Sequence, residues 1–174
     1  GADNGSMGFE AFARTAGYTH YFGRTEYNEA NPDNKDFDGH WGIWDEKFFQ
    51  FFGNTLSGFQ QPFAAALFSL SSHHPFAVPA EYEGVFPKGN KPIRQCIGYT
   101  DNALKLFVEK VSKEPWYKNT LFVFTADHTN SPERPEYETE SGLFSVPVVF
   151  YQPGSDLKGF RKDVIAQQID IMPT

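Results

Sequence analysis

Two adjacent residues, Asp127 and His128, have side chains of the kind that bind metal ions. They directly follow the run 120–126, whose apolar and β-branched residues predict a buried strand. Ligands of parallel α/β sheets bind at the carboxyl ends of strands, and a turn after Ala126 would bring both side chains to one point. A carboxylate and an imidazole suit a divalent cation such as Zn or Mn. The alternative is that Asp127 caps a turn while His128 is merely exposed.

A second polar cluster, residues 71–76, follows the apolar run 61–70, which has the composition of a buried parallel strand, with a short buried helix as the alternative. It contains the adjacent pair His73 and His74, and Pro75 restricts His74 to extended conformations. One of the two imidazoles could bind an anionic group of a substrate or donate a proton to it. The alternative is a pair of ordinary loop histidines, one packed and one solvated.

Other chemically capable residues have structural explanations. Asp45 and Asp101 each stand where a helix begins in the expected pattern, so both are predicted to be N-caps. The single cysteine, Cys96, excludes a disulfide within the chain and is predicted to be a buried, unreactive thiol. Trp116 and Tyr117 are predicted to pack. The sequence has neither a glycine-rich phosphate loop nor a Gly-x-Ser-x-Gly motif.

The elements that must position these residues alternate between helices and apolar strands. Helical spacing of apolar residues predicts helices over 6–16, with Ser6 as N-cap, over 45–56, and from Thr100 or Asp101 to 112. Strands are predicted over 19–22, 61–70, 120–126, 146–151 and 164–169, and a polar loop over 25–40. This alternation predicts an α/β fold with a mostly parallel sheet that carries helices on both faces.

Composition narrows the class of protein. The chain has 174 residues, and 15 Lys+Arg against 22 Asp+Glu give a net charge of −7, which argues against nucleic acid as a partner. An aromatic content of 17% excludes a disordered chain. No apolar run is long enough to cross a bilayer, and residues 1–5 do not read as a signal peptide.

Read in order, the motifs resemble the sulfatase group of the alkaline phosphatase superfamily. The similarity is closest to the membrane-anchored branch that includes lipoteichoic acid synthase and other phosphoglycerol transferases. The residues that carry it span the chain: Gly17-Tyr18, Trp41-Gly42-Ile43-Trp44-Asp45, Gln61-Pro62-Phe63, Ser72-His73-His74-Pro75-Phe76, Tyr99-Thr100-Asp101, Asp127-His128, Val146-Pro147 and 168–174.

The resemblance implies an alkaline-phosphatase-like sandwich around a mixed, mostly parallel sheet, and a bound divalent metal that is Mn, Zn, Mg or Ca depending on the branch. By position, Asp127 and His128 match the family's adjacent Asp-His metal ligands. His73 matches a histidine that binds the phospho group of the substrate. The family's nucleophile, a Thr, Ser or formylglycine, lies upstream of the matched region, so residues 1–174 are expected to contain no catalytic nucleophile.

These implications define the expected function. Residues 1–174 would be the C-terminal portion of one catalytic domain, without the upstream nucleophile half and membrane helices, and inactive alone. The parent would be a membrane-anchored, extracytoplasmic hydrolase or transferase. Its substrate would be an anionic phospho- or sulfo-ester, such as a lipid headgroup or a glycan. Two alternatives are a non-catalytic scaffold or binding domain that keeps the fold, and a formylglycine-type glycan sulfatase.

Overall fold

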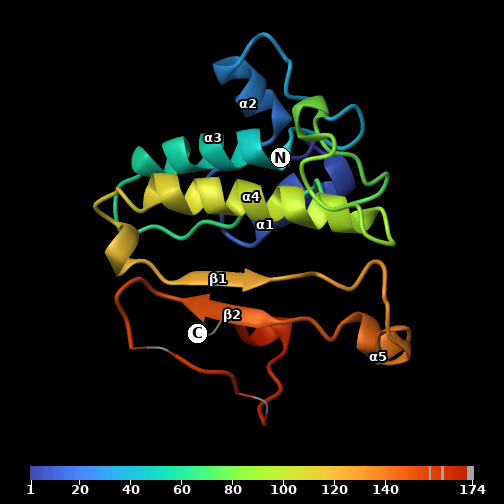
Figure 1. Cartoon of the computed structure of the whole chain (residues 1–174). Coiled ribbons are helices and arrows are strands. Elements are labelled where there is room, and N and C mark those ends of the chain that lie inside the picture. The colour runs from blue at the N-terminus through green and yellow to red at the C-terminus, as the bar shows by residue number, and fades with distance from the viewer. Residues whose placement is uncertain (157, 162, 172–174) are drawn as a thin grey trace. The chain divides into compact units, whose positions relative to one another are not determined.

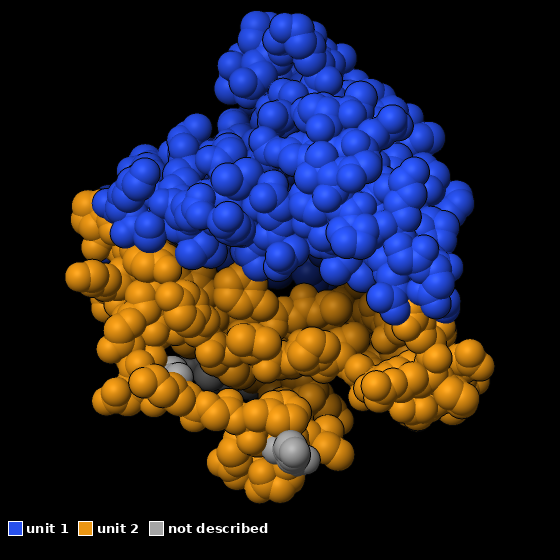
Figure 2. Space-filling model, in the orientation of Figure 1, with its two compact units in different colours: residues 1–113 blue, residues 114–174 orange. Residues whose placement is uncertain are grey.

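The computed structural model describes residues 1–156, 158–161 and 163–171. The chain divides into two compact units, Gly1–Lys113 and Glu114–Thr174 (Figure 2).

The first unit is built on two helices that lie side by side, α3 (Asp45–Ser57) and α4 (Ile93–Val111) (Figure 1). The helix predicted over 45–56 is thus confirmed, and Gly58 ends it. Phe107 of α4 packs against Phe49, with ring centroids 6.2 Å apart, and against Phe52 at 5.9 Å. These rings place the core of the unit between the two helices.

Helix α4 differs from its prediction at its start. It begins at Ile93, directly after Pro92, so Thr100 and Asp101 lie inside it and neither is an N-cap. Its buried face is a stripe at three- and four-residue spacing, which is the spacing of one face of a helix. The early start also buries Cys96, as predicted for that thiol. The buried residues of α4 are Cys96, Tyr99, Ala103, Phe107 and Val111.

The helix predicted over 6–16 is a 3₁₀ turn, η1 (Ser6–Gly8), followed by α1 (Phe9–Thr15), and Gly8 rather than Ser6 precedes α1. The strand predicted over 19–22 is wrong, since these residues are irregular. The loop predicted over 25–40 contains a helix, α2 (Arg24–Ala30). A helix was not predicted here because the sequence is polar. The Glu26 carboxylate caps the start of α2, where it accepts the Gly23 N–H at 2.6 Å.

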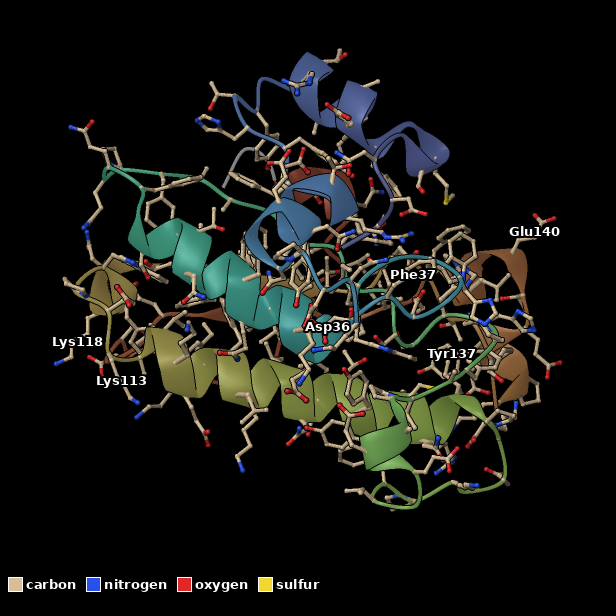
Figure 3. The ribbon with its side chains drawn as sticks, turned by 90° about the horizontal axis from the view of Figure 1, so that it is seen from above. Asp36, Phe37, Lys113, Lys118, Tyr137 and Glu140 are labelled. Atoms are coloured by element: carbon tan, nitrogen blue, oxygen red, sulfur yellow. The ribbon has the colours of Figure 1, made fainter. Side chains whose placement is uncertain are left out.

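The loop between α2 and α3 is held on both sides. Asp36 and Phe37 lie on it (Figure 3); Tyr27 donates to Asp36 Oδ2 at 2.6 Å, and the Arg24 guanidinium lies 3.5 Å from the centre of the Phe37 ring. Further along, Gly42 pairs with Ala2 in an isolated β-bridge, so close that a Cβ on Gly42 would meet backbone atoms. These contacts fix the path of residues 36–44 up to the start of α3.

The predicted strand over 61–70 is wrong. These residues form no strand, and Leu70 is the residue of the run that is buried. A strand needs a neighbour for its N–H and C=O groups, and none of the residues described here provides one. The run instead leads, as an extended segment, into the loop that carries His73. A short 3₁₀ turn, η2 (Ala80–Tyr82), lies between that loop and α4.

The second unit contains a two-stranded sheet. Strand β1 (Phe122–Thr125) pairs with β2 (Val148–Tyr151), and Phe122 lies opposite Tyr151 (Figure 1). Both strands were predicted. The pair is antiparallel and is the only sheet among the described residues, so the mostly parallel sheet with helices on both faces is not seen in this part of the chain. Before β1, the 3₁₀ turn η3 (Tyr117–Asn119) follows Trp116, and both Trp116 and Tyr117 are buried, as predicted.

The remainder of the second unit is made of short turns. These are η4 (Pro135–Tyr137), α5 (Glu140–Leu143), capped by the Thr139 hydroxyl, and η5 (Gln168–Ile171). The strand predicted over 164–169 is wrong, because 164–167 is irregular and η5 begins at Gln168. This turn brings the Gln168 side chain back to the end of β1.

Candidate functional site

Asp127 and His128 form a tight turn one residue after β1. The backbone N–H of His128 donates to Asp127 Oδ1 at 2.9 Å. The other carboxylate oxygen, Oδ2, lies 3.4 Å from His128 Nε2. The predicted turn after Ala126 therefore brings both side chains to one point, with one carboxylate oxygen and one imidazole nitrogen facing the same space.

Neighbouring groups orient the imidazole of His128. Its Nδ1 lies 3.1 Å from the carbonyl oxygen of Thr129, which can only accept, so Nδ1 carries a hydrogen and Nε2 is the nitrogen that faces Asp127 Oδ2. The ring also packs edge-on against Phe144, with centroids 6.4 Å apart. The Thr129 N–H donates to the Leu143 carbonyl at 2.7 Å, which ties this turn to the end of α5.

Gln168 supports the same turn from η5. Its side-chain amide donates to the carbonyl of Asp127 at 3.2 Å and also to the carbonyl of Ala126. The amide thus fixes the backbone at the point where β1 ends and the polar pair begins. Sequence reasoning expected a strand here and assigned Gln168 no individual role; its place in the resemblance motif over 168–174 was the available signal.

The pair fits a divalent cation as two members of a larger ligand set. Two ligands about 2.1 Å from one tetrahedral cation lie about 3.4 Å apart, which matches the Nε2–Oδ2 distance of 3.4 Å. Both side chains are accessible, with exposed fractions of 57% for Asp127 and 46% for His128. No group of three or more His, Cys, Asp or Glu suited to a metal occurs within residues 1–156, 158–161 and 163–171. The pair by itself is therefore not a complete metal site within the described residues.

His73 lies in the first unit, on the exposed loop after Leu70. Its Nδ1 is 3.0 Å from the carbonyl oxygen of His74, and its ring meets the Trp41 ring edge-on, with centroids 4.5 Å apart. Trp41 also donates its indole N–H to the same His74 carbonyl at 2.8 Å. An open depression of about 400 Å³ adjoins this loop, lined by Gly39, His40, Trp41, His74 and Pro75.

Asp45 anchors the start of the His73 loop. It is the first residue of α3 and not its N-cap, so that prediction is wrong. Its fully buried carboxylate accepts the backbone N–H groups of Leu70 at 2.8 Å and Ser71 at 3.0 Å, and the Thr100 hydroxyl at 3.2 Å. Burial raises the pKa of the carboxyl, against the opposing effect of these hydrogen bonds. The carboxylate thus joins α3, α4 and the loop.

Known proteins resemble this chain along most of its length. The family model Sulfatase matches residues 2–174. Lipoteichoic acid synthase 1 of Bacillus subtilis is 25% identical over 91% of this chain and 26% of its own length, and lipoteichoic acid synthase-like YvgJ of the same organism is 30% identical over 51% and 15%. The chain thus spans about a quarter or less of the length of these relatives.

The fold has a counterpart among solved structures. A protein of the alkaline phosphatase superfamily from Vibrio parahaemolyticus aligns with 74% of this chain and 31% of its own, with a TM-score of 0.58 and 23% identity. In the part of the chain that the structure describes, no helix is both long and apolar enough to span a bilayer. The family model covers nearly the whole chain and the solved neighbour shares its fold, so this chain belongs to the sulfatase family and has an α/β, alkaline-phosphatase-like fold.

Proposed function

We propose that this chain is the C-terminal portion of the catalytic domain of a metal-dependent enzyme that transfers or hydrolyses a phospho- or sulfo-ester. Asp127 and His128 would hold a divalent cation, Mn, Zn, Mg or Ca. The observation that carries the proposal is the turn after β1, which places Asp127 Oδ2 and His128 Nε2 3.4 Å apart, both on accessible side chains. When bound, the metal would activate the nucleophile and neutralise charge on the transferred group.

His73 would bind the anionic group of the substrate. Its Nδ1–H is committed to the His74 carbonyl, so Nε2 is the nitrogen left for a substrate oxygen. A protonated imidazole would donate an N–H to a phosphoryl or sulfuryl oxygen, and this charge-assisted hydrogen bond is stronger than one between neutral groups. The nucleophile and the remaining metal ligands would come from residues outside this chain.

The relatives favour a phosphoester as the substrate. One of them is named lipoteichoic acid synthase 1 and the other lipoteichoic acid synthase-like, so we propose a phosphoglycerol-type lipid headgroup, with catalysis on the outer side of a membrane to which the complete protein is anchored. A glycan sulfate is the competing substrate within the same family.

The test uses the complete protein that contains this chain. Asp127→Ala and His128→Ala are each expected to reduce turnover by about 10³-fold or more and to lower the metal content, since each removes a ligand. Asp33→Ala, which removes an exposed carboxylate from the loop after α2, is the matched control and should leave both quantities unchanged. Activity is measured with a phosphodiester and with an aryl sulfate, and metal content by mass spectrometry.

Three outcomes would contradict parts of the proposal. Full activity and full metal content in both variants would exclude the pair as ligands. A wild-type protein that binds no metal and turns over neither ester would indicate a scaffold or binding domain instead. Turnover of the aryl sulfate but not of the phosphodiester would replace the phosphoglycerol assignment with a sulfatase.

A further inference from the structure

The loop that carries His73 has one carbonyl group with two donors. The His74 carbonyl oxygen accepts the Trp41 indole N–H at 2.8 Å and lies 3.0 Å from His73 Nδ1. A carbonyl oxygen has two lone pairs and can accept both hydrogen bonds. Because this oxygen cannot donate, the contact requires Nδ1 of His73 to carry the hydrogen. The neutral ring is then the Nδ1–H tautomer, with its lone pair on Nε2.

Trp41 holds this arrangement in two ways. Its N–H fixes the direction of the His74 carbonyl, and its ring packs edge-on against the His73 ring, with centroids 4.5 Å apart. The indole thus fixes the position of the His74 carbonyl, which selects the tautomer, and restricts the rotation of the His73 imidazole. A protein group that orients a functional histidine in this way is expected to affect activity although it does not touch the substrate.

The backbone that carries Trp41 is itself fixed. Its N–H donates to Asp38 Oδ1 at 2.8 Å, and its carbonyl accepts the Asp3 N–H at 3.1 Å. Gly42, the next residue, is confined by the bridge to Ala2. The indole is therefore presented to the His73 loop from a well-anchored segment, which is what a positioning group needs.

We propose that Trp41 is a positioning residue that, through the His74 carbonyl, keeps a hydrogen of the His73 imidazole on Nδ1, so that Nε2 is the nitrogen left for the substrate and, when protonated, donates to its anionic group. The inference rests on the proposed function where it concerns the substrate. The tautomer and its dependence on Trp41 are properties of this chain alone and are tested separately.

The first experiment measures the tautomer directly, by long-range ¹H–¹⁵N NMR of the imidazole of His73 in the 174-residue chain at about pH 9, where imidazoles are ordinarily neutral. His73→Gln assigns the signals. The wild-type chain is expected to show the Nδ1–H form. Trp41→Phe keeps an aromatic ring but removes the N–H, and should shift the population toward the Nε2–H form.

Two further variants keep the result decisive. Trp41→His places a ring nitrogen near the position of the indole nitrogen and should restore the Nδ1–H form in part. Trp44→Phe makes the same change three residues away, where the indole packs edge-on against Tyr99 at 6.1 Å, and should leave the tautomer unchanged. An Nε2–H form in the wild type, or an unaltered tautomer in folded Trp41→Phe, would overturn the inference.

The second experiment follows activity of the complete protein on a phosphodiester. Trp41→Phe is expected to lower kcat/KM about ten-fold, and His73→Gln to lower it further. The double variant should be no worse than His73→Gln alone, because Trp41 acts through His73. Additive losses would contradict the positioning role. Full activity of His73→Gln would instead refute the proposed substrate contact, while the NMR result would still decide what Trp41 does.

Discussion

Asp45 in the first unit and Asp127 in the second are the same residue type in opposite surroundings. The Asp45 carboxylate is completely buried and accepts hydrogen bonds from two backbone N–H groups and one hydroxyl. The Asp127 side chain is 57% exposed, and its Oδ1 accepts one hydrogen bond, from the backbone of the next residue. The oxygens of Asp45 are occupied by hydrogen bonds within the fold, whereas Asp127 is accessible to a ligand.

The difference shows why residue type alone did not separate structure from chemistry. Both residues belong to the resemblance motifs, and both stand next to a predicted element. The Asp45 oxygens accept three hydrogen bonds from two segments of one unit, the loop at Leu70 and α4, and a carboxylate so occupied and buried has little capacity left for a cation. Asp127 keeps Oδ2 directed toward the Nε2 of His128. Accessible, unsaturated donor atoms therefore distinguish the candidate ligand.

The largest expected effect on stability comes from Asp45→Ala. It leaves the buried N–H groups of Leu70 and Ser71 without an acceptor, so the free energy of unfolding should fall by about 3 kcal/mol. Asp127→Ala is the matched change at the exposed carboxylate and should alter the free energy of unfolding by no more than about 0.5 kcal/mol. Urea denaturation of the 174-residue chain, followed by circular dichroism, measures both. Equal losses would abolish the contrast between the two residues.

A smaller effect should follow from Thr100→Val. This change keeps the shape of the side chain but removes the hydroxyl that donates to Asp45 Oδ2 at 3.2 Å, and should cost about 1 kcal/mol. Thr125→Val, at the exposed end of β1, removes a hydroxyl that donates to the neighbouring Ala126 carbonyl at 3.2 Å in an exposed position, and serves as the control. The same denaturation measurement applies. An equal loss of unfolding free energy in Thr125→Val and Thr100→Val would show that the hydrogen bond from Thr100 to Asp45 contributes no more than that of an exposed hydroxyl.

The smallest expected change is in the pH dependence of stability. Burial raises the folded-state pKa of Asp45 above that of an unfolded Asp, so its contribution is fully present below the unfolded value, about 4, and is lost as pH rises through the folded value. Asp45→Asn should remove this decline, and Asp127→Asn should retain it. Unfolding free energies measured between about pH 4 and 7 test the point. Identical pH profiles in all three proteins would contradict it.

The sequence predicted those elements whose own residues form the buried face. Helix α3 and the two strands were found because Phe48, Phe49 and Leu56, and the apolar runs near 122–125 and 148–151, repeat at helical or strand spacing. It failed for α2, which is stabilised mainly by hydrogen bonds of Glu26 and Asn4 rather than by an apolar stripe. It also failed for 61–70, because strand formation depends on a neighbour and not on composition.

The features of the candidate site likewise separate into those that the sequence determined and those that depend on the tertiary structure. The sequence by itself determined the adjacency of Asp127 and His128 after a strand and the family to which the chain belongs, because order and spacing along the chain carry both. Only the tertiary structure decided that Asp45 is saturated, that Gln168 supports the turn after β1, and that Trp41 faces His73. Hydrogen bonds between residues tens of positions apart depend on how the segments fold against one another, which local residue patterns do not specify.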